Sequence, residues 1–241
     1  MFVSLMSMGC SMGFYHGVIP EIKDDIATLR PTVFVAVPRL WNRSADAIST
    51  GIETMPGTKG KLARKALRTK LAKCQRTGQY THCCWDRLVF KKTKARVGGR
   101  VRFLVSGSAP LSKDTINFLK VAFCCPMIEG YGLTETLITA CTRPEDKMAG
   151  IVGGVTVCNE LKLVDIPDMD YHSTDKKDGE SYPRGEVCYR GPTVFQGYFR
   201  QDEKTDEAID EDGWFHTGDV GELQPNLGLK IIDRMKNIFK L

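Results

Sequence analysis

A chain of 241 residues is long enough to bury a substantial core, and its 42 % hydrophobic and 26 % charged residues are typical of a soluble globular protein rather than a disordered one. Fourteen basic residues and a single acid lie between Lys59 and Arg100, so this segment carries +13, while the whole chain carries +5 and the remainder −8. The nine cysteines include no C-x-x-C pair and have no histidine cluster nearby, which favours a reduced, intracellular chain of buried thiols over a disulfide framework or a metal clamp.

The first twenty residues carry no charge before Glu21, which raises the question of a membrane segment or a signal peptide. They lack a basic start, and the apolar run is interrupted at Gly9, Gly13, Gly17 and Pro20. We therefore expect an interior strand and turn here.

The next segment alternates between helical and strand patterns. Ile19–Leu29 has apolar residues at helical spacing with charges between them, which predicts a short amphipathic helix. Arg30-Pro31 ends it, Thr32–Val37 is a β-branched run suited to a buried parallel strand, and Pro38 begins the next helix. A strand between helices favours α/β architecture.

The basic segment 59–100 contains one helical stripe of apolar residues with bases on the other faces, formed by Leu62, Ala66, Leu67, Leu71 and Cys74. Three interpretations remain open: a solvated helical arm packed by its apolar stripe, a surface for anionic lipid headgroups, and a nucleic-acid site. Nucleic acid is not expected, because neither a recognisable binding fold nor a series of interleaved aromatic residues accompanies the charge.

The second half changes from α/β to all-β. Val101–Val105 reads as a strand, Ser112–Phe123 as a helix capped by Ser112, and a glycine turn at Ile128–Thr136 leads into a further helix that ends near Cys141. Asp165–Pro183 reads as a polar loop. Short strands are predicted at Glu160–Ile166, Gly185–Arg190, Val220–Leu223 and Leu229–Asp233.

These patterns predict an α/β fold with a layered, mostly parallel sheet and helices, joined to a small β-barrel-like lobe. We place the first lobe at residues 1–149, the β-rich lobe at 150–235 and a hinge stub at 236–241.

The glycine turn carries the strongest chemical signal, reading I-E-G-Y-G-L-T-E-T. Two glycines around Tyr131 allow the backbone to approach a ligand closely and leave the ring as a flat platform. Thr134 and Glu135 offer hard oxygen ligands suited to Mg²⁺ that carries phosphates. A plain glycine turn followed by a helix cap is the alternative.

Four motifs in order resemble the adenylate-forming superfamily: V-S-G-S-A-P-L-S at 105–112, the glycine turn, G-W-F-H-T-G-D at 213–219 and K-I-I-D-R-M-K at 230–236. The likeness runs from about Gly13 to the last residue. It is greatest to the long-chain fatty acyl-CoA synthetases, through R-P-T-V-F at 30–34, V-P-R-L at 37–40, E-V-C at 186–188 and G-P…V-F-Q-G-Y at 191–198.

The resemblance implies a ligase that joins a long-chain fatty acid to coenzyme A through an acyl-adenylate, using ATP and Mg²⁺ and releasing AMP and diphosphate. It also implies an intracellular site on the cytosolic face of a membrane such as the endoplasmic reticulum, the mitochondrial outer membrane or the peroxisome. The implied nucleotide-binding residues are Ser108, Ala109, Glu129, Gly130, Tyr131, Gly132, Asp219 and Arg234, and the implied catalytic residues are Thr134 and Glu135, which would also bind the metal, and the hinge lysine Lys236.

Tyr131 would lie against the adenine, Asp219 would accept the ribose hydroxyls, and Arg234 would donate to the sugar or to phosphate. Each role has a structural alternative. In these alternatives Asp219 is an acid of a turn, and Arg234 and Lys236 are solvated bases at a strand end. Glu135 is an acid that stabilises a helix N-terminus.

The superfamily's glycine-rich phosphate loop and its C-terminal lysine-bearing domain are not found within residues 1–241, and Asn237 departs from the acid that many relatives carry. We therefore expect a truncated, inactive fragment of such a ligase. The alternative is a non-catalytic protein derived from that fold, which binds a nucleotide, an acyl chain or a membrane surface.

Overall fold

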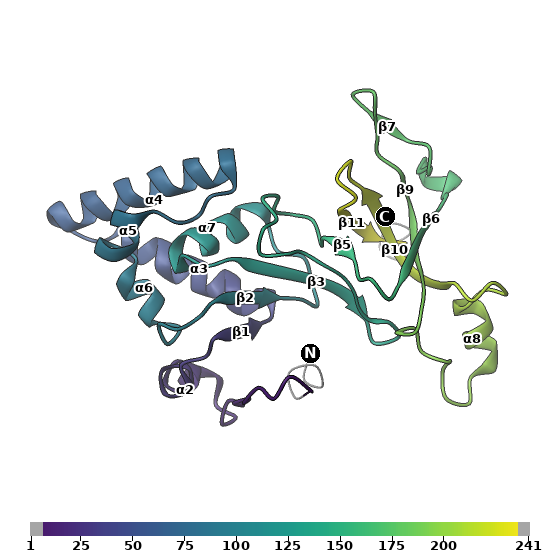
Figure 1. Ribbon diagram of the computed structural model, residues 1–241, viewed down its shortest axis with the longest axis horizontal. Coiled ribbons are helices and arrows are strands. Elements are labelled where there is room, and N and C mark those ends of the chain that lie inside the picture. Colours follow the sequence, from purple (N-terminus) through teal and green to yellow (C-terminus); the bar gives the residue numbers. More distant parts are fainter. Residues whose placement is uncertain (1–6, 236–241) are drawn as a thin grey trace.

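The computed structural model describes residues 7–235, which form an α/β arrangement of two principal sheets with helices (Figure 1). The helices are η1 (Ile19–Glu21), α2 (Ile22–Leu29), α3 (Pro38–Glu53), α4 (Gly57–Thr77), α5 (Cys83–Leu88), α6 (Lys91–Ala95), α7 (Lys113–Phe123), η2 (Pro167–Met169) and α8 (Asp202–Ala208). The strands are β1 (Val33–Ala36), β2 (Phe103–Ser106), β3 (Met127–Leu133), β4 (Leu137–Cys141), β5 (Gly154–Val155), β6 (Glu160–Val164), β7 (Lys176–Lys177), β8 (Glu180–Ser181), β9 (Arg184–Arg190), β10 (Phe215–Leu223) and β11 (Leu229–Arg234).

The first sheet has the order β1-β2-β3-β4-β5. β1, β2 and β3 are parallel, as the β-branched run at 32–37 predicts for β1, whereas β4 and β5 add to the edge in antiparallel fashion. The carboxyl ends of β2 and β3 therefore meet at one edge of the sheet. This is the edge at which open α/β sheets bind ligands.

The prediction of a helix after the glycine turn is wrong. Residues 134–136 form the turn of a hairpin, and β4 then returns along β3. Gly130, Tyr131 and Gly132 consequently lie in a strand rather than in the turn. The β-branched residues of the L-I-T-A-C segment favour a strand, and its pairing with β3 outweighs the helix signal of Thr134 and Glu135.

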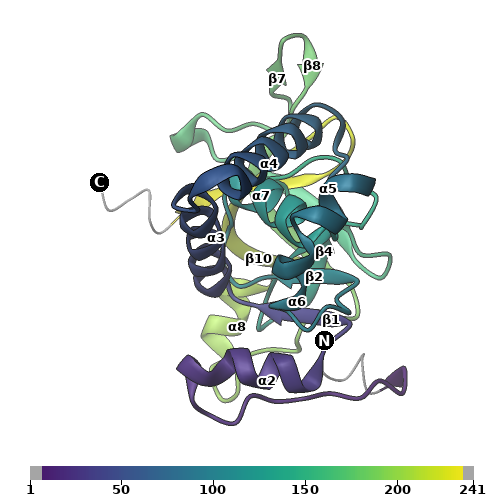
Figure 2. The same cartoon turned by 90° about the vertical axis from the view of Figure 1, so that its left-hand side faces the viewer.

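Helices α3, α4 and α7 pack together on one side of the first sheet, above strands β1 and β2 in both Figure 1 and Figure 2. Trp41 of α3 is fully buried at this contact, and its Nε1 donates to the carbonyl oxygens of Ala36 and Val105, 3.0 and 3.1 Å away. The Trp41 ring also meets Phe34 and Phe123 edge to face. One side chain thus joins α3, the sheet and α7.

The second sheet is antiparallel, in the order β11-β10-β9-β6, and a separate small core of Ala140, Val187, Tyr189 and Leu229 lies under it. All four predicted strands are present. Within residues 7–235 this sheet is open and does not close into the barrel that we expected. β5 belongs to the first sheet although it follows residue 149, and the division into lobes stays a prediction.

Three smaller expectations need correction. Residues 7–18 contain no strand, because the glycine-rich segment finds no partner strand among the described residues. Leu62 of the predicted apolar stripe is exposed, whereas Ala63 and Lys70 are buried, so the packed face of α4 is rotated relative to the prediction. All nine cysteines are free, but Cys10, Cys83, Cys84 and Cys158 are exposed rather than buried.

Within residues 7–235, none of the helices combines the length and the apolar character that crossing a bilayer requires. The polar loop predicted at 165–183 is present, with the short β7–β8 hairpin inside it.

Candidate functional site: a cavity between the two sheets

A cavity of about 420 Å³ lies where the carboxyl ends of β2 and β3 face the second sheet. Its volume is within the range of small-molecule sites. Eight of the residues predicted to bind the nucleotide line it: Ser108, Ala109, Glu129, Gly130, Tyr131, Gly132, Asp219 and Arg234. Segments more than a hundred residues apart in sequence therefore meet around one space.

Asp219 organises one wall of this cavity. β10 pairs with β9 at His216 and again at Val220, so the residues between them form a bulge that ends at Asp219. Asp219 is 3 % exposed, and its two carboxylate oxygens accept from the Tyr131 hydroxyl at 2.7 Å and from Arg234 Nε at 2.8 Å. A carboxylate offers about four acceptor positions, so these two bonds leave capacity for ligand hydroxyls.

The Tyr131 ring is held in place rather than free. Its hydroxyl is bound to Asp219, and its ring lies 6.2 Å from that of Tyr189 between centroids. Burial, reinforced by the Asp219 charge, raises the pKa of Tyr131. The phenol therefore stays protonated and can keep donating.

Glu129 is a second buried acid of the cavity, beside Asp219. It is 8 % exposed, and burial raises its pKa from 4.5 to about 7, although backbone N–H groups of Gly150 and Leu111 and the charge of Lys120 oppose that rise. Gly150 and Leu111 belong to the two loops that complete the cavity wall. The protonation state of Glu129 therefore changes near neutral pH beside these loops.

Two backbone positions explain the small residues in the motifs. A Cβ on Gly132 would stand 1.6 Å from the Leu137 carbonyl oxygen, so the hairpin tolerates no side chain there. Ser108 has φ of +73°, the left-handed region that a non-glycine residue enters only when its surroundings hold it there. Both positions shape the rim of the cavity.

Several lining residues were missed by the sequence analysis, including Ser106, Gly150, Ile151, Val152 and Ile231. Ser106 is 2 % exposed, and its hydroxyl has no hydrogen-bond partner among the described residues. A buried hydroxyl without a partner beside a cavity is suited to bind a polar ligand, because it is costly to leave unpaired. Its place at the carboxyl end of the strand predicted at Val101–Val105 was the signal that could have found it.

Thr134 and Glu135 lie outside this lining. They follow Leu133, which does line the cavity, so the hairpin turn stands at its rim. Glu135 faces the segment after β9: its carboxylate accepts from the Tyr198 hydroxyl at 2.9 Å, and its carbonyl accepts from Phe195 N at 2.7 Å. Thr134 is exposed. Lys236 lies outside the described residues.

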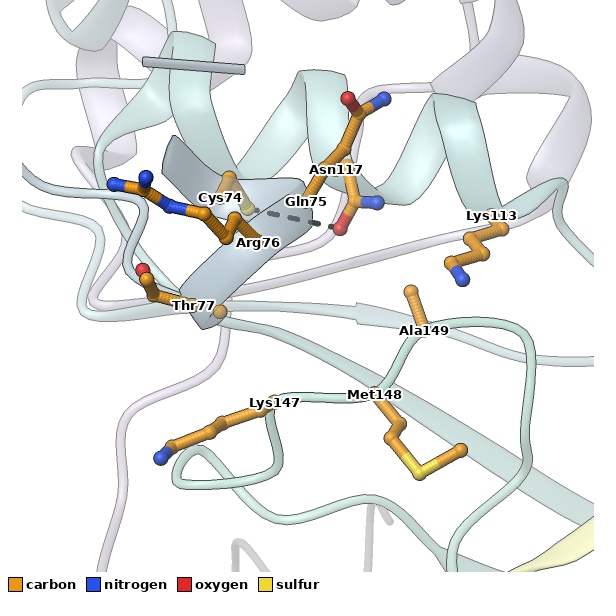
Figure 3. Close-up of a pocket in the computed structure, with 10 residues that line it drawn as sticks. Cys74, Gln75, Arg76, Thr77, Lys113, Asn117, Lys147, Met148 and Ala149 are labelled. Atoms are coloured by element: carbon orange, nitrogen blue, oxygen red, sulfur yellow. Dashed lines mark hydrogen bonds between the residues drawn. The ribbon is translucent and has the colours of Figure 1, made fainter. Parts of the chain in front are cut away.

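A second cavity, of about 460 Å³, lies at the far end of α4, near the start of α7 and the 147–149 loop (Figure 3). Arg76, Lys113 and Lys147 line it, and its lining contains no acid. In Figure 3 the charged ends of these three side chains lie on different sides and do not point at one common spot. It also contains no aromatic ring for a base, so the first cavity is the better candidate.

Comparison with known proteins adds to this geometry. A family model described as AMP-binding enzyme matches residues 1–199. The peroxisomal long chain acyl-CoA synthetase 7 of Arabidopsis thaliana is 46 % identical over 234 residues, which are 97 % of this chain and 33 % of the relative. Fatty acyl-CoA synthetase A of Dictyostelium discoideum is 48 % identical over 99 % of this chain and 35 % of the relative.

Among solved structures, the A domain of a carboxylic acid reductase from Segniliparus rugosus, in complex with AMP and a co-purified carboxylic acid, superposes with a TM-score of 0.61 at 26 % identity. The match covers 90 % of this chain and 29 % of that chain. This chain spans about a third of the length of the curated relatives it matches. The family model nevertheless covers most of its residues, and the chain belongs to the AMP-binding enzyme family.

Proposed function

We propose that this chain forms the nucleotide pocket of a long-chain fatty acid–CoA ligase, which converts a fatty acid, ATP and coenzyme A into acyl-CoA, AMP and diphosphate. The single observation that carries the proposal is the convergence of Tyr131, Asp219 and Arg234 on one cavity beside the unpaired hydroxyl of Ser106. The long-chain acyl-CoA synthetases among its relatives, and the AMP and carboxylic acid in the similar reductase domain, support this choice of ligands.

The chemistry of the lining fits a nucleoside monophosphate. The Tyr131 ring offers a flat apolar face, and the small residues Ser108, Ala109 and Gly130 allow a base to approach the backbone closely. Asp219 would accept from ribose hydroxyls, and the exposed side chain of Arg234 would donate to the sugar or to phosphate. The residues present therefore fit the group.

The oxygens of Thr134 and Glu135 at the rim would hold Mg²⁺, which supplies positive charge to the phosphates when it is bound. The Tyr198 hydroxyl orients one oxygen of Glu135 and leaves the other available. Lys236 is proposed as the hinge residue, and coenzyme A as the acceptor of the acyl group. The expected location is the cytosolic face of an intracellular membrane.

Nucleotide binding is expected to weaken when Asp219 becomes asparagine. The substitution removes the charge and replaces one of the two acceptor oxygens with an amide, so AMP or ATP affinity should fall by about 1–3 kcal/mol. Calorimetric titration of the folded chain with each nucleotide measures the loss. Asp178→Asn, an exposed acid in the β7–β8 hairpin, should leave the affinity unchanged.

Tyr131→Phe separates the contribution of the aromatic ring from that of the hydroxyl. It keeps the ring and removes only the hydroxyl that donates to Asp219. It should cost less affinity than Asp219→Asn. Equal nucleotide affinities for wild type and Asp219→Asn, with both proteins folded by circular dichroism, would remove Asp219 from the site.

A second candidate function is binding to an anionic membrane surface. Ten of the fourteen bases of segment 59–100 are exposed, and the segment contains α5, α6 and most of α4 at one end of the molecule (Figure 1). Lys61, Lys65 and Arg68 recur at helical spacing on α4 and are all exposed. Such a surface suits phosphatidylserine headgroups.

Replacing Lys61, Lys65 and Arg68 together by glutamine should weaken binding to phosphatidylserine vesicles by about 1 kcal/mol per charge, and added salt should weaken the wild type similarly. Sedimentation with the vesicles measures the bound fraction. The matched control removes three exposed bases elsewhere, Lys176, Lys177 and Lys204. If both triple variants bind equally, the bases of α4 belong to a solvated helical arm.

A further inference from the structure

Three side chains of the types that bind metal ions lie close together on the second sheet, outside the cavity lining. Cys188 of β9 and His216 of β10 are direct cross-strand partners, and Glu186 stands two residues before Cys188 on the same face of β9. One ligand atom of each lies within 4.8 Å of the other two. His216 Nδ1 is 2.9 Å from Glu186 Oε2 and 3.4 Å from Cys188 Sγ.

Glu186 and Cys188 compete for a single atom, His216 Nδ1. If His216 Nδ1 carries a proton, it donates to Glu186 and cannot accept from the Cys188 thiol. If Nδ1 is unprotonated, it can accept from Cys188 but faces an ionised carboxylate, which also accepts only. The other acceptor near the thiol is the Glu186 carbonyl oxygen, 3.9 Å from Sγ. A cation at the centre would satisfy all three side chains at once.

The surroundings supply the second layer of contacts that metal ligands usually have. His216 Nε2 lies 3.5 Å from Asp210 Oδ2, which would fix the ring and leave Nδ1 as the ligand. Asp210 is itself held, because its Oδ1 accepts from Trp214 N at 2.8 Å. Glu186 Oε1 accepts from Gly218 N at 3.0 Å, which leaves Oε2 for the metal.

The charge and access of the cluster also suit a divalent cation. Glu186 and Asp210 carry two negative charges, and Lys162, 3.5 Å from Asp210, supplies one positive charge. The Glu186 and His216 side chains are 14 % and 29 % exposed, so an ion can enter from their side while Cys188 closes the inner side. A fourth position remains for water.

We propose that Cys188, His216 and Glu186 form a Zn²⁺ site with one open position. Thiolate, imidazole and carboxylate are all zinc ligands, and tetrahedral bonds of about 2.0–2.3 Å require His216 Nδ1 to separate only slightly from Glu186 Oε2 and Cys188 Sγ, which are now 2.9 and 3.4 Å away. On binding, the Cys188 thiol releases its proton to solvent as the sulfur–metal bond forms.

The site would act on the fold rather than on a substrate. Glu186 holds Gly218 of the bulge that carries Asp219, so a metal that fixes Glu186 also fixes the position of Asp219 in the cavity wall. The proposal does not depend on the proposed ligase function, because metal binding can be measured without any nucleotide.

Cobalt titration of the 241-residue chain tests the proposal. His82, Cys83 and Cys84 form a second group of possible ligands, so Cys83 and Cys84 are first replaced by serine. One equivalent of Co²⁺ should then produce a thiolate-to-cobalt charge-transfer absorption that Zn²⁺ displaces. Cys188→Ser should abolish this absorption, whereas the matched Cys158→Ser, an exposed cysteine outside the cluster, should retain it.

Asp210→Asn should weaken metal affinity about 10–100-fold without removing a ligand. A measurement that needs no change at Cys188 is zinc X-ray absorption on the same chain, which should show one sulfur neighbour near about 2.3 Å and nitrogen or oxygen neighbours near about 2.0–2.1 Å. Failure to bind Co²⁺ or Zn²⁺, a Cys188→Ser spectrum equal to its parent, or a zinc shell without sulfur would each overturn the proposal.

Discussion

Lys70→Ala is expected to lower the free energy of unfolding by about 3–5 kcal/mol, the cost of removing one partner from a buried ion pair. Lys70 is 1 % exposed in the middle of α4. Its ammonium group pairs with Asp86 and donates to the Val121 carbonyl oxygen at 2.8 Å, while the Phe90 ring lies over it at 4.4 Å. The substitution would leave Asp86 charged and half-buried without its counter-ion.

Asp86 also makes a second hydrogen bond, which adds to the cost of leaving it without Lys70. Its other carboxylate oxygen accepts from His82 N at the start of α5, so the pair links α4, α5 and α7. Although burial opposes it, the bonds from Lys70 and His82 lower the pKa of Asp86. The carboxylate therefore stays ionised, and its stabilising effect is lost only as the pH falls below its ordinary range.

Urea denaturation followed by circular dichroism measures the change, with Lys73→Ala as the control on the same helix. Lys73 is only partly buried, and its replacement should cost about 0.5 kcal/mol or less. The double variant Lys70→Met/Asp86→Leu should recover the part of the loss that comes from the unpaired charge, although it also removes the bond from His82 N. A Lys70→Ala curve that matches Lys73→Ala would show that this ion pair contributes little.

Lys70 also shows where the sequence analysis reached its limit. Among fourteen bases in one segment, nothing in the pattern marks this lysine as the buried one, because its partners come from α5 and α7. Packing by the apolar stripe was one of three interpretations, and α4 does pack by one face, although that face is rotated from the stripe. Which residues form that face depends on the neighbouring helices, and those contacts are non-local.

The parallel strands β1 and β2 and the helix α7 were predictable because each is decided locally. Their apolar runs, the proline before α3 and the Ser112 cap lie within the elements themselves. The hairpin of β3 and β4 was not, because Thr134 and Glu135 read as a helix start. What decides the strand is its pairing with β3 and β5 on either side.

In the candidate site, too, locally encoded features were predictable and features that depend on contacts between distant segments were not. The motifs predicted the residues that now line the cavity, among them Tyr131 and Asp219, although 88 residues separate these two. The bond between them, and the contribution of residues 150–152, arise only when the two sheets face each other. Glu135 was expected at the phosphates, and its observed partner Tyr198 lies in a segment for which no such contact was predicted.

The second large effect concerns Glu129, whose pKa is raised from 4.5 to about 7 chiefly by burial. The unfolded chain ionises this carboxyl near pH 4.5, whereas the folded chain keeps it protonated to about pH 7. Between these values the folded state binds more protons. The contribution of the Glu129 carboxyl to the free energy of unfolding is therefore fully present below about pH 4.5 and is lost as the pH rises toward 7.

The shift corresponds to about 3 kcal/mol at roughly 1.4 kcal/mol for each pKa unit. Glu129→Gln keeps a carbonyl oxygen for the Gly150 and Leu111 N–H groups but cannot ionise. The variant and the wild type should therefore be about equally stable near pH 4.5, and the variant should be the more stable by about 3 kcal/mol above pH 7. Acids whose pKa is lowered in the folded state, such as Asp86, change the stability at lower pH. They do so equally in the variant and in the wild type, so they cancel in the comparison.

Urea denaturation of both proteins at intervals from about pH 4.5 to about pH 8 measures the difference between them. Glu207→Gln, an exposed position on α8, controls for the loss of one carboxyl and should run parallel to the wild type. Stability curves for Glu129→Gln and wild type that stay parallel across the whole range would show that Glu129 ionises freely.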